Sequence, residues 1–298
     1  MFLLFLCYNR FMKRFALIIS ILLFTYQGCF ASENNDNAFV QFIKNIPEKH
    51  SINLLLKEQN KYSKKYDLEG LSSLYSENFK SSDDFDKEVY FKLIDETWKS
   101  YPDITYSTKV NNIKIDGNKA YVEVDESALA SVTQLDKEVT VYGELNSSSK
   151  GTYLLEKIDN KWKIVGEIID NEKSMLRFGD TRFVKMDLSS PQIVNPDEYY
   201  TASLTVESPE DALIIASISR DKIVYPQEKA EEVYRKLPDD NILERMFLAN
   251  KECKNEYNVA SIGMTKSREN MFGKLEVYMA GVAFIMVRVN VQEGENGK

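Results

Sequence analysis

Apolar and polar residues alternate with a period of two through much of residues 104–169, and this alternation is the strongest constraint on the fold. Such a period places successive side chains on opposite faces of a β-strand. Asp116-Gly117-Asn118 interrupts the alternation with a sequence that is typical of a tight hairpin turn. We therefore expect a meander of antiparallel strands. Its later members are predicted at 120–125, 139–144, 152–156 and 162–169.

The residues before these strands have the three-to-four-residue spacing of amphipathic helices. Asp67 is predicted to cap a helix over residues 68–75, and Asp84 or Asp86 to cap a helix over residues 87–100. Helices followed by a run of strands predict an α+β domain, in which a curved antiparallel sheet wraps around the helices.

From residue 182 the predicted strands recur at the short spacing of a β-sandwich, with turns rich in Pro, Asn and Asp. The charged residues 227–250 have helical spacing, and we expect them to form a helical insertion. Residues 182–292 are therefore predicted to be an immunoglobulin-like sandwich, although they lack the Cys…Trp…Cys signature. A linker is expected at 173–181 and a polar tail at 293–298.

Two stretches of the first part resemble the NTF2-like (SnoaL-like) superfamily. Residues 67–79 read Asp-Leu-Glu-Gly-Leu-Ser-Ser-Leu-Tyr-Ser-Glu-Asn-Phe, and residues 156–164 carry a turn followed by Trp-Lys-Ile. The resemblance covers about residues 50–172, and it places an NTF2-like domain at 51–172. It implies a cone of helices packed in a curved sheet, with a pocket at the open end. Because such domains often pair through the outer sheet face, it also implies a homodimer.

Some members of that superfamily place a pocket carboxylate as a proton acceptor beside tyrosine donors, for isomerase, dehydratase or cyclase chemistry. Apolar walls raise the pKa of such a carboxyl group toward neutrality. The resemblance makes Glu144 and Asp125 the catalytic candidates, with Glu156 as a further strand carboxylate. Acidic residues on strands more often face solvent, however, and aromatic residues more often form the core. The aromatic candidates for the pocket are Tyr75, Tyr90, Trp98, Tyr142 and Tyr153.

The composition excludes several classes of function. His50 is the one histidine of the 298 residues, so a histidine-based catalytic dyad and a Cys/His zinc site are excluded. We therefore expect no metal and no cofactor. The net charge of −8 disfavours nucleic acid as a partner. The sequence also carries no P-loop and no dinucleotide-binding motif.

An uncharged apolar run, residues 15–24, follows three cations near the N-terminus. A run of this length matches the core of a signal peptide, whereas a membrane-spanning helix needs about 20 apolar residues. Residues 1–31 are therefore predicted to be a cleaved signal, with Cys29 and Ala31 at the small-residue positions of the cleavage site. An uncleaved anchor and lipidation of Cys29 are the alternatives, and translation could start at Met12.

Removal of the signal takes away three cations and no anion, so the charge of the remaining chain is about −11. It also leaves Cys253 as the one cysteine, and an intramolecular disulfide is then impossible. The polar residues 32–50 contain one short apolar stretch that could form a helix against the first domain.

These observations predict an exported, non-catalytic protein that binds a small ligand or a protein partner at the bacterial cell envelope. A secreted NTF2-like enzyme of the isomerase or dehydratase type and a structural envelope protein are the alternatives. The enzyme requires a strand carboxylate buried inside the cone among Tyr or Trp side chains. The ligand-binding hypothesis requires an open mouth to the cone or an exposed apolar patch.

Overall fold

The computed structural model describes residues 35–133, 141–227, 232–269 and 271–293. The predicted signal at 1–31 lies outside these ranges, and so does the tail beyond residue 293. The helices are α2 (Asn35–Lys65), α3 (Leu68–Ser72) and α4 (Lys87–Ser100), with the 3-10 turn η1 (Asp180–Phe183). The strands are β1 (Tyr75–Ser81), β2 (Thr105–Asp116), β3 (Lys119–Val132), β4 (Gly143–Ile158), β5 (Lys161–Gly179), β6 (Met186–Ser189), β7 (Ile193–Val194), β8 (Tyr199–Val206), β9 (Ala212–Lys222), β10 (Arg235–Lys236), β11 (Ile242–Leu248), β12 (Glu256–Glu269) and β13 (Leu275–Val291).

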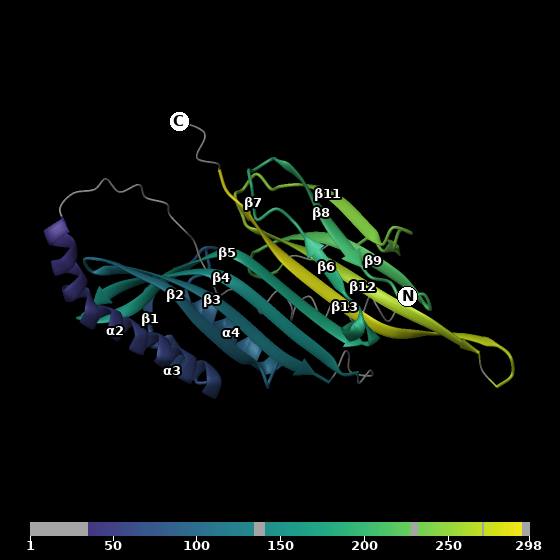
Figure 1. The fold of residues 1–298 in the computed structure, drawn as a ribbon, viewed down its shortest axis with the longest axis horizontal. Helices are drawn as coiled ribbons and strands as arrows, with labels where there is room; N and C mark the ends of the chain where they lie inside the picture. The colour runs from purple at the N-terminus through teal and green to yellow at the C-terminus, as the bar shows by residue number, and fades with distance from the viewer. Residues whose placement is uncertain (1–34, 134–140, 228–231, 270, 294–298) are drawn as a thin grey trace.

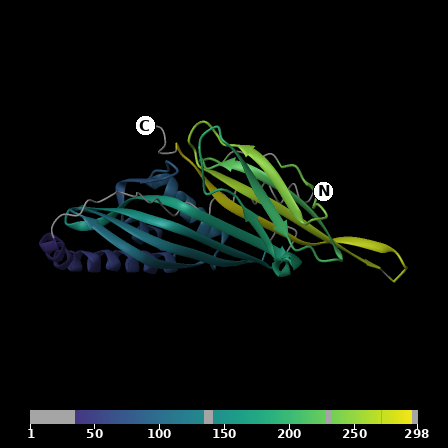
Figure 2. The ribbon, with the colours of Figure 1, turned by 45° about the horizontal axis from the view of Figure 1, so that its top comes forward.

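One large sheet extends through both halves of the described chain. Its order is β10-β9-β12-β13-β5-β4-β3-β2, and β1 and β7 pair with β5 and β13 from outside this path. The path itself is antiparallel throughout. Figures 1 and 2 show the helices at one end of this sheet and a second sheet, in the order β11-β8-β6, at the other end. The predicted α+β class is therefore wrong, because the described fold is mostly β.

The residues predicted as a linker lie at the centre of the large sheet. Lys173–Val287 and Gly179–Gly281 are the outer pairs of the ladder between β5 and β13, and β4 pairs with the opposite edge of β5. Ser174, Leu176 and Phe178 are each 0% exposed. Their spacing of two is a strand pattern, which the apolar Met175 and the charged Arg177 between them obscure in the sequence. Residues 173–179 thus join the two halves rather than separate them.

The predicted helical insertion at 227–250 is also wrong over its described part. Ile242–Leu248 is strand β11, which pairs along its whole length with β8. Leu243 and Phe247 are buried on one face of β11, so the apolar residues follow a strand period there. With no helical insertion and a sheet shared between the halves, the separate immunoglobulin-like sandwich is not found.

Local signals in the sequence located several elements correctly. Helix α4 spans Lys87–Ser100, as predicted, and the Asp86 side chain caps it by accepting a hydrogen bond from Val89 N at 2.9 Å. Asp67 caps α3 through Gly70 N, also at 2.9 Å. The expected hairpin turn at residues 116–118 joins β2 to β3.

The segment after that hairpin differs from the prediction. Strands were expected at 139–144 and 152–156 around a turn, but β4 continues without interruption across residues 146–151. Ser147 and Ser148 pair with β3 on one side and with β5 on the other. Polar residues of low strand propensity are held there by neighbours on both edges, which a local pattern cannot reveal.

No helix among the described residues combines the length and the apolar character that crossing a membrane requires. Within the same ranges, no group of three or more His, Cys, Asp and Glu side chains is placed to hold a metal ion.

A buried ion pair links the helical end of the molecule to the large sheet. Asp83 lies in the loop before α4, and Arg288 lies on β13; their side chains are 1% and 0% exposed. The guanidinium group donates two hydrogen bonds to the carboxylate, at 3.0 and 2.5 Å. Asn255 Nδ2 adds a third, at 2.8 Å to Asp83 Oδ1. Arg and a carboxylate interact most strongly in this bidentate geometry.

A second buried carboxyl group, that of Glu172, lies beside this pair and is hydrogen-bonded to a tyrosine rather than to Arg288. Glu172 is 3.8 Å from Arg288 Nη1, and it accepts a hydrogen bond from the Tyr257 hydroxyl at 2.8 Å. Burial raises the pKa of Glu172 well above its usual range, which the charge of Arg288 only partly offsets. Arg288, the one buried cation among the described residues, therefore pairs with Asp83, while burial shifts Glu172 toward its neutral form.

We predict that Arg288→Met strongly destabilises the protein, because it leaves the Asp83 carboxylate buried without its cation. Removing one partner of a buried pair costs about 3–5 kcal/mol of unfolding free energy. Arg268→Met is the control, because the Arg268–Glu276 pair is 69% and 46% exposed and contributes about 1 kcal/mol at most. Urea unfolding measures both variants, and equal losses in the two would contradict this account.

Candidate functional site

A small cavity lies between the helices and the inner face of the sheet. Its volume is about 30 Å³, enough for one or two water molecules. Every helix of the first half and four of its strands contribute to the wall. The lining residues are Gln59, Asn60, Ser63, Leu71, Tyr75, Ile94, Trp98, Tyr106, Thr108, Glu126 and Tyr153.

Glu126 is the one acidic residue in this lining. The buried residues Ala120, Val122 and Val124 precede it at intervals of two on β3, so its side chain continues their inward-facing row. Glu126 Oε1 accepts hydrogen bonds from Tyr153 Oη at 2.9 Å and Thr108 Oγ1 at 3.0 Å. Oε2 accepts no hydrogen bond from the described residues, but it is not among their buried atoms that lack a partner; the buried acceptor without a donor in this lining is Gln59 Oε1.

Burial among apolar and aromatic side chains raises the pKa of Glu126 to about 7. The hydrogen bonds from Tyr153 and Thr108 act in the opposite direction, because they stabilise the ionised form. No cation is among the lining residues of the cavity to stabilise the ionised form further. Near neutral pH the carboxyl group is therefore present in both protonation states, which is the condition for general acid–base chemistry.

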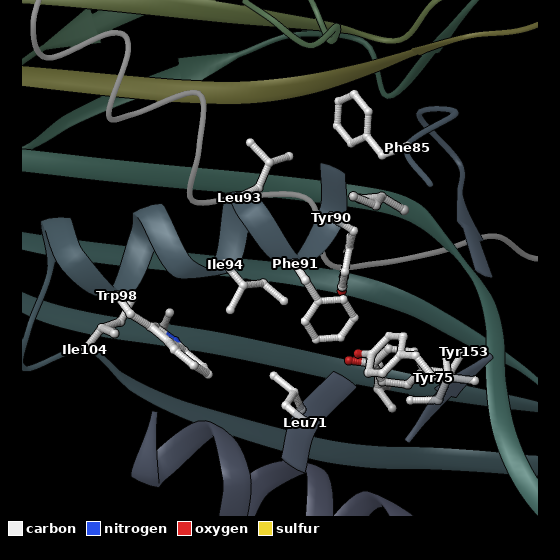
Figure 3. Packing of buried hydrophobic residues seen from close by; sticks show 14 of the residues in the cluster. Leu71, Tyr75, Phe85, Tyr90, Phe91, Leu93, Ile94, Trp98, Ile104 and Tyr153 are labelled. Carbon is white, nitrogen blue, oxygen red and sulfur yellow. The ribbon is translucent and has the colours of Figure 1, made fainter. Parts of the chain in front are cut away.

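Gln59 orients the two tyrosine hydroxyl groups at the floor of the cavity. Its Nε2 donates to Tyr153 Oη at 2.9 Å and to Tyr75 Oη at 3.1 Å. Figure 3 shows these two phenol oxygens side by side. Because Gln59 fills an acceptor position on Tyr153, the hydroxyl hydrogen is directed to Glu126.

The opposite wall is made by Trp98 and Tyr106. Trp98 Nε1 donates to Tyr106 Oη at 3.2 Å, and Tyr66 packs edge-on against the indole with ring centroids 5.4 Å apart. Burial raises the pKa of Tyr106 far above neutrality, so its hydroxyl keeps its hydrogen. Tyr106 Oη has no acceptor among the described residues, and its hydrogen is therefore available to a ligand.

The cavity opens onto a wider depression on the surface. The two spaces share Asn60, Tyr106 and Thr108, which form the mouth between α2 and β2. The outer depression has a volume of about 580 Å³, which is within the range of small-molecule sites.

A second buried carboxyl group lies deeper in the same layer. Glu167 on β5 is 1% exposed and accepts a hydrogen bond from the Tyr90 hydroxyl at 2.8 Å. Burial raises the pKa of Glu167 well above its usual range. Neither residue lines the cavity.

The structure places the predicted aromatic residues in three kinds of position. Tyr75, Trp98 and Tyr153 line the cavity, and Tyr90 lies fully buried behind it. Tyr142 is 46% exposed, and the Arg182 guanidinium lies 4.5 Å from its ring centroid on the outside of the sheet.

The predicted catalytic carboxylates do not line the cavity. Glu144 pairs with Arg182 at 3.2 Å, and Asp125 faces Lys109 at 3.6 Å on the outer face of β3. Glu156 accepts a hydrogen bond from Asn118 at an exposed site. A role for these three as pocket bases therefore fails, but the adjacent Glu126 meets the same requirement. Extending the apolar row at 120, 122 and 124 by one step would have identified it.

No family model matches the chain, and no curated protein matches it. Solved structures match part of it. A predicted scytalone dehydratase from Novosphingobium aromaticivorans aligns over 41% of this chain and 82% of its own length, with 19% identity and a TM-score of 0.33. A predicted dehydratase of the NTF2-like family from Streptomyces avermitilis aligns over 40% and 93%, with 14% identity and a TM-score of 0.33.

A conserved protein from Planctomyces limnophilus aligns over 40% of this chain and 92% of its own, with 17% identity and a TM-score of 0.31. These matches extend over about two fifths of the chain, and with TM-scores of 0.31–0.33 they do not assign the chain to a family. At this level the likeness concerns the fold alone. The chemistry of the site has to be argued from the residues that line it.

The raised pKa of Glu126 predicts a specific dependence of stability on pH. Its value in the fold, about 7, lies above the value of 4.5 for a free side chain. Protonated Glu126 therefore stabilises the fold fully below about pH 4.5, and this contribution is lost as the pH rises through 7. Because one pKa unit corresponds to about 1.4 kcal/mol, the loss is up to about 3 kcal/mol.

Glu126→Gln removes this titration, so its stability relative to the natural sequence increases between pH 4.5 and 7. Urea unfolding at a series of pH values measures the difference. Asp125→Asn is the matched control on the outer face of the same strand, and it should leave the pH profile unchanged. Parallel profiles for Glu126→Gln and the natural sequence would show that Glu126 titrates normally.

Proposed function

We propose that this chain is an exported protein that binds a small molecule at the mouth of the Glu126 cavity. The observation that carries this proposal is Gln59 Oε1, a buried acceptor in the cavity lining to which the described residues provide no donor. An unpaired polar atom inside a protein is costly unless another molecule satisfies it. The hydroxyl of Tyr106 provides a second unused group on the opposite wall, so a ligand with both a donor and an acceptor fits the site.

The dimensions favour binding at the mouth over complete enclosure. The inner space of about 30 Å³ admits only a group the size of a hydroxyl or a water molecule, whereas the outer depression of about 580 Å³ accommodates the rest of a ligand. Tyr106, which lines both spaces, supplies apolar contact area, and the few polar groups fix the orientation.

The titration of Glu126 near pH 7 favours proton transfer as a second candidate function. Its carboxylate could remove a proton from a bound substrate, while Tyr153 stabilises the ionised form by its hydrogen bond. The reaction class is proton abstraction or elimination at a group small enough to enter the inner space. Glu126 is the candidate base for this chemistry.

Trp98 provides a direct test of the binding proposal. The chain has two tryptophans, and Trp162 lies outside the cavity, so Trp162→Phe leaves Trp98 as the single emitter. We expect at least one member of a panel of small acids, alcohols and sugars to shift the Trp98 emission in a saturable manner. Asn60→Phe in that background fills the mouth and should abolish the shift.

Asn53→Phe is the control for this substitution. Asn53 and Asn60 lie on the same helix, and each donates its side-chain amide to the carbonyl four residues earlier. Asn53 is exposed and does not line the cavity, so this variant should bind as before. A shift that survives Asn60→Phe, or a panel without any effect on Trp98, would refute binding at this site.

The catalytic candidate makes a different prediction. Any compound that the protein turns over should react with a rate that rises with pH around a midpoint near 7, because only ionised Glu126 accepts a proton. Glu126→Gln should reduce that rate by about 100-fold or more, and Asp125→Asn should leave it unchanged. An undiminished rate in the Glu126→Gln variant would exclude Glu126 as the base.

A further inference from the structure

Four lysines lie along one side of α2, next to the mouth of the cavity. Lys57, Lys61, Lys64 and Lys65 are exposed, and all four line the outer depression of about 580 Å³. Their spacing of four, three and one residues places them on one face of the helix. The depression also includes Asn60, Tyr106 and Thr108, which it shares with the Glu126 cavity.

Within the described part of the chain, these four cations have no acidic partner. The ion pairs of the described residues include none of them, and no Asp or Glu is among the residues that line the depression. The chain as a whole carries a net charge of −8, so it has many carboxylates that could have paired with them. A local excess of positive charge on an acidic protein is therefore a specific property of this surface.

The helix dipole explains the position of only some of these lysines. Cations in the last turn interact favourably with the partial negative charge there, which explains Lys64 and Lys65. Lys57 lies two turns earlier, beyond the reach of that effect. Moreover, Lys57–Lys61 and Lys61–Lys65 are like-charge pairs at i,i+4, an arrangement that destabilises a helix. The arrangement is thus unfavourable for the folded chain alone and becomes favourable when an anion is bound.

Hydrogen-bond donors accompany the charges. Tyr106 Oη accepts from Trp98 Nε1 and keeps its own hydrogen without an acceptor among the described residues. This hydroxyl lines both the depression and the inner cavity. Lysine ammonium groups and a neutral hydroxyl donor are the combination that recognises a carboxylate or phosphate oxygen.

We propose that the depression formed by Lys57, Lys61, Lys64 and Tyr106 binds the oxyanion of a small soluble molecule, a carboxylate or a phosphate. This inference rests on the proposed binding function and specifies the class of its ligand. The volume of the depression suits a small molecule, and the net charge of the chain opposes a long polyanion such as nucleic acid. The uncharged end of the ligand is then directed toward the mouth.

The test uses the Trp162→Phe background with inorganic pyrophosphate and citrate as probes. We expect either anion to shift the Trp98 emission or to give calorimetric heat, with binding that weakens as the salt concentration rises from about 20 to about 200 mM. Lys57→Gln/Lys61→Gln should weaken the binding by about tenfold or more, because it removes two of the charges. Both lysines are exposed, so this variant should fold normally.

Lys119→Gln/Lys150→Gln is the control, with the same change of charge at two exposed lysines outside the depression. Equal weakening in both double variants would reduce the effect to net charge and overturn the proposal. Binding only to phosphatidylglycerol vesicles, without binding of either free anion, would also overturn it.

The proposal and the binding function on which it rests fail in different ways. A neutral compound that shifts Trp98 and is blocked by Asn60→Phe, while neither anion binds, would keep the binding function and overturn the anion assignment. If no neutral or anionic compound affects Trp98 or gives heat, both are overturned.

Discussion

The pair between Arg288 and Asp83 determines where the helical layer lies on the sheet. A buried guanidinium group requires its carboxylate, since each charge alone would be strongly unfavourable inside the protein. Asp83 is four residues before the first residue of α4, so the pair also fixes the start of that helix relative to β13. From that start, α4 places Tyr90 opposite Glu167 and Trp98 in the wall of the cavity. The site therefore depends on an ion pair that belongs to neither the cavity nor its mouth.

A hydrogen bond from a tyrosine hydroxyl to a buried glutamic acid occurs three times on the inner face of the sheet. Glu126, Glu167 and Glu172 each accept a hydrogen bond from a tyrosine hydroxyl, at 2.8–2.9 Å, and burial raises the pKa of each. A hydroxyl donor partly replaces the lost water without adding a charge to the interior. The three differ in access: Glu167 and Glu172 are at most 3% exposed, whereas Glu126 borders the cavity. Of this set, only Glu126 can exchange its proton with a molecule in that space.

The sequence predicted the features that depend on neighbouring residues and failed on those that depend on distant ones. A capping aspartate and an apolar stripe suffice to define α4, and Asp-Gly-Asn suffices for the turn after β2. The continuous strands β4 and β5 need partners on both edges, and these partners lie as far away as β13. The sequence analysis predicted Asp125 as a pocket carboxylate, whereas the structure places its neighbour Glu126 there. Neighbouring residues of a strand lie on opposite faces of the sheet, so a shift of one residue exchanges the inner side chain for the outer one. The helical spacing of the lysines on α2 can be read from the sequence, but the depression beside them cannot, because β2 forms its other side.

Helix α2 connects the interior chemistry to the surface. Ile52, Leu55 and Leu56 hold it to the core, and Gln59 continues this buried face into the floor of the cavity. Lys57 and Lys61 lie two residues on either side of Gln59, which the helical period turns outward to the rim. Asn60 stands between the two faces, at the mouth. For a molecule with an anionic end and a small neutral polar end, this one helix thus provides lysines at the rim, Asn60 at the mouth and Gln59 in the cavity. The same helix orients Tyr153 through Gln59, so α2 contributes both to the rim and to the hydrogen bonding of Glu126.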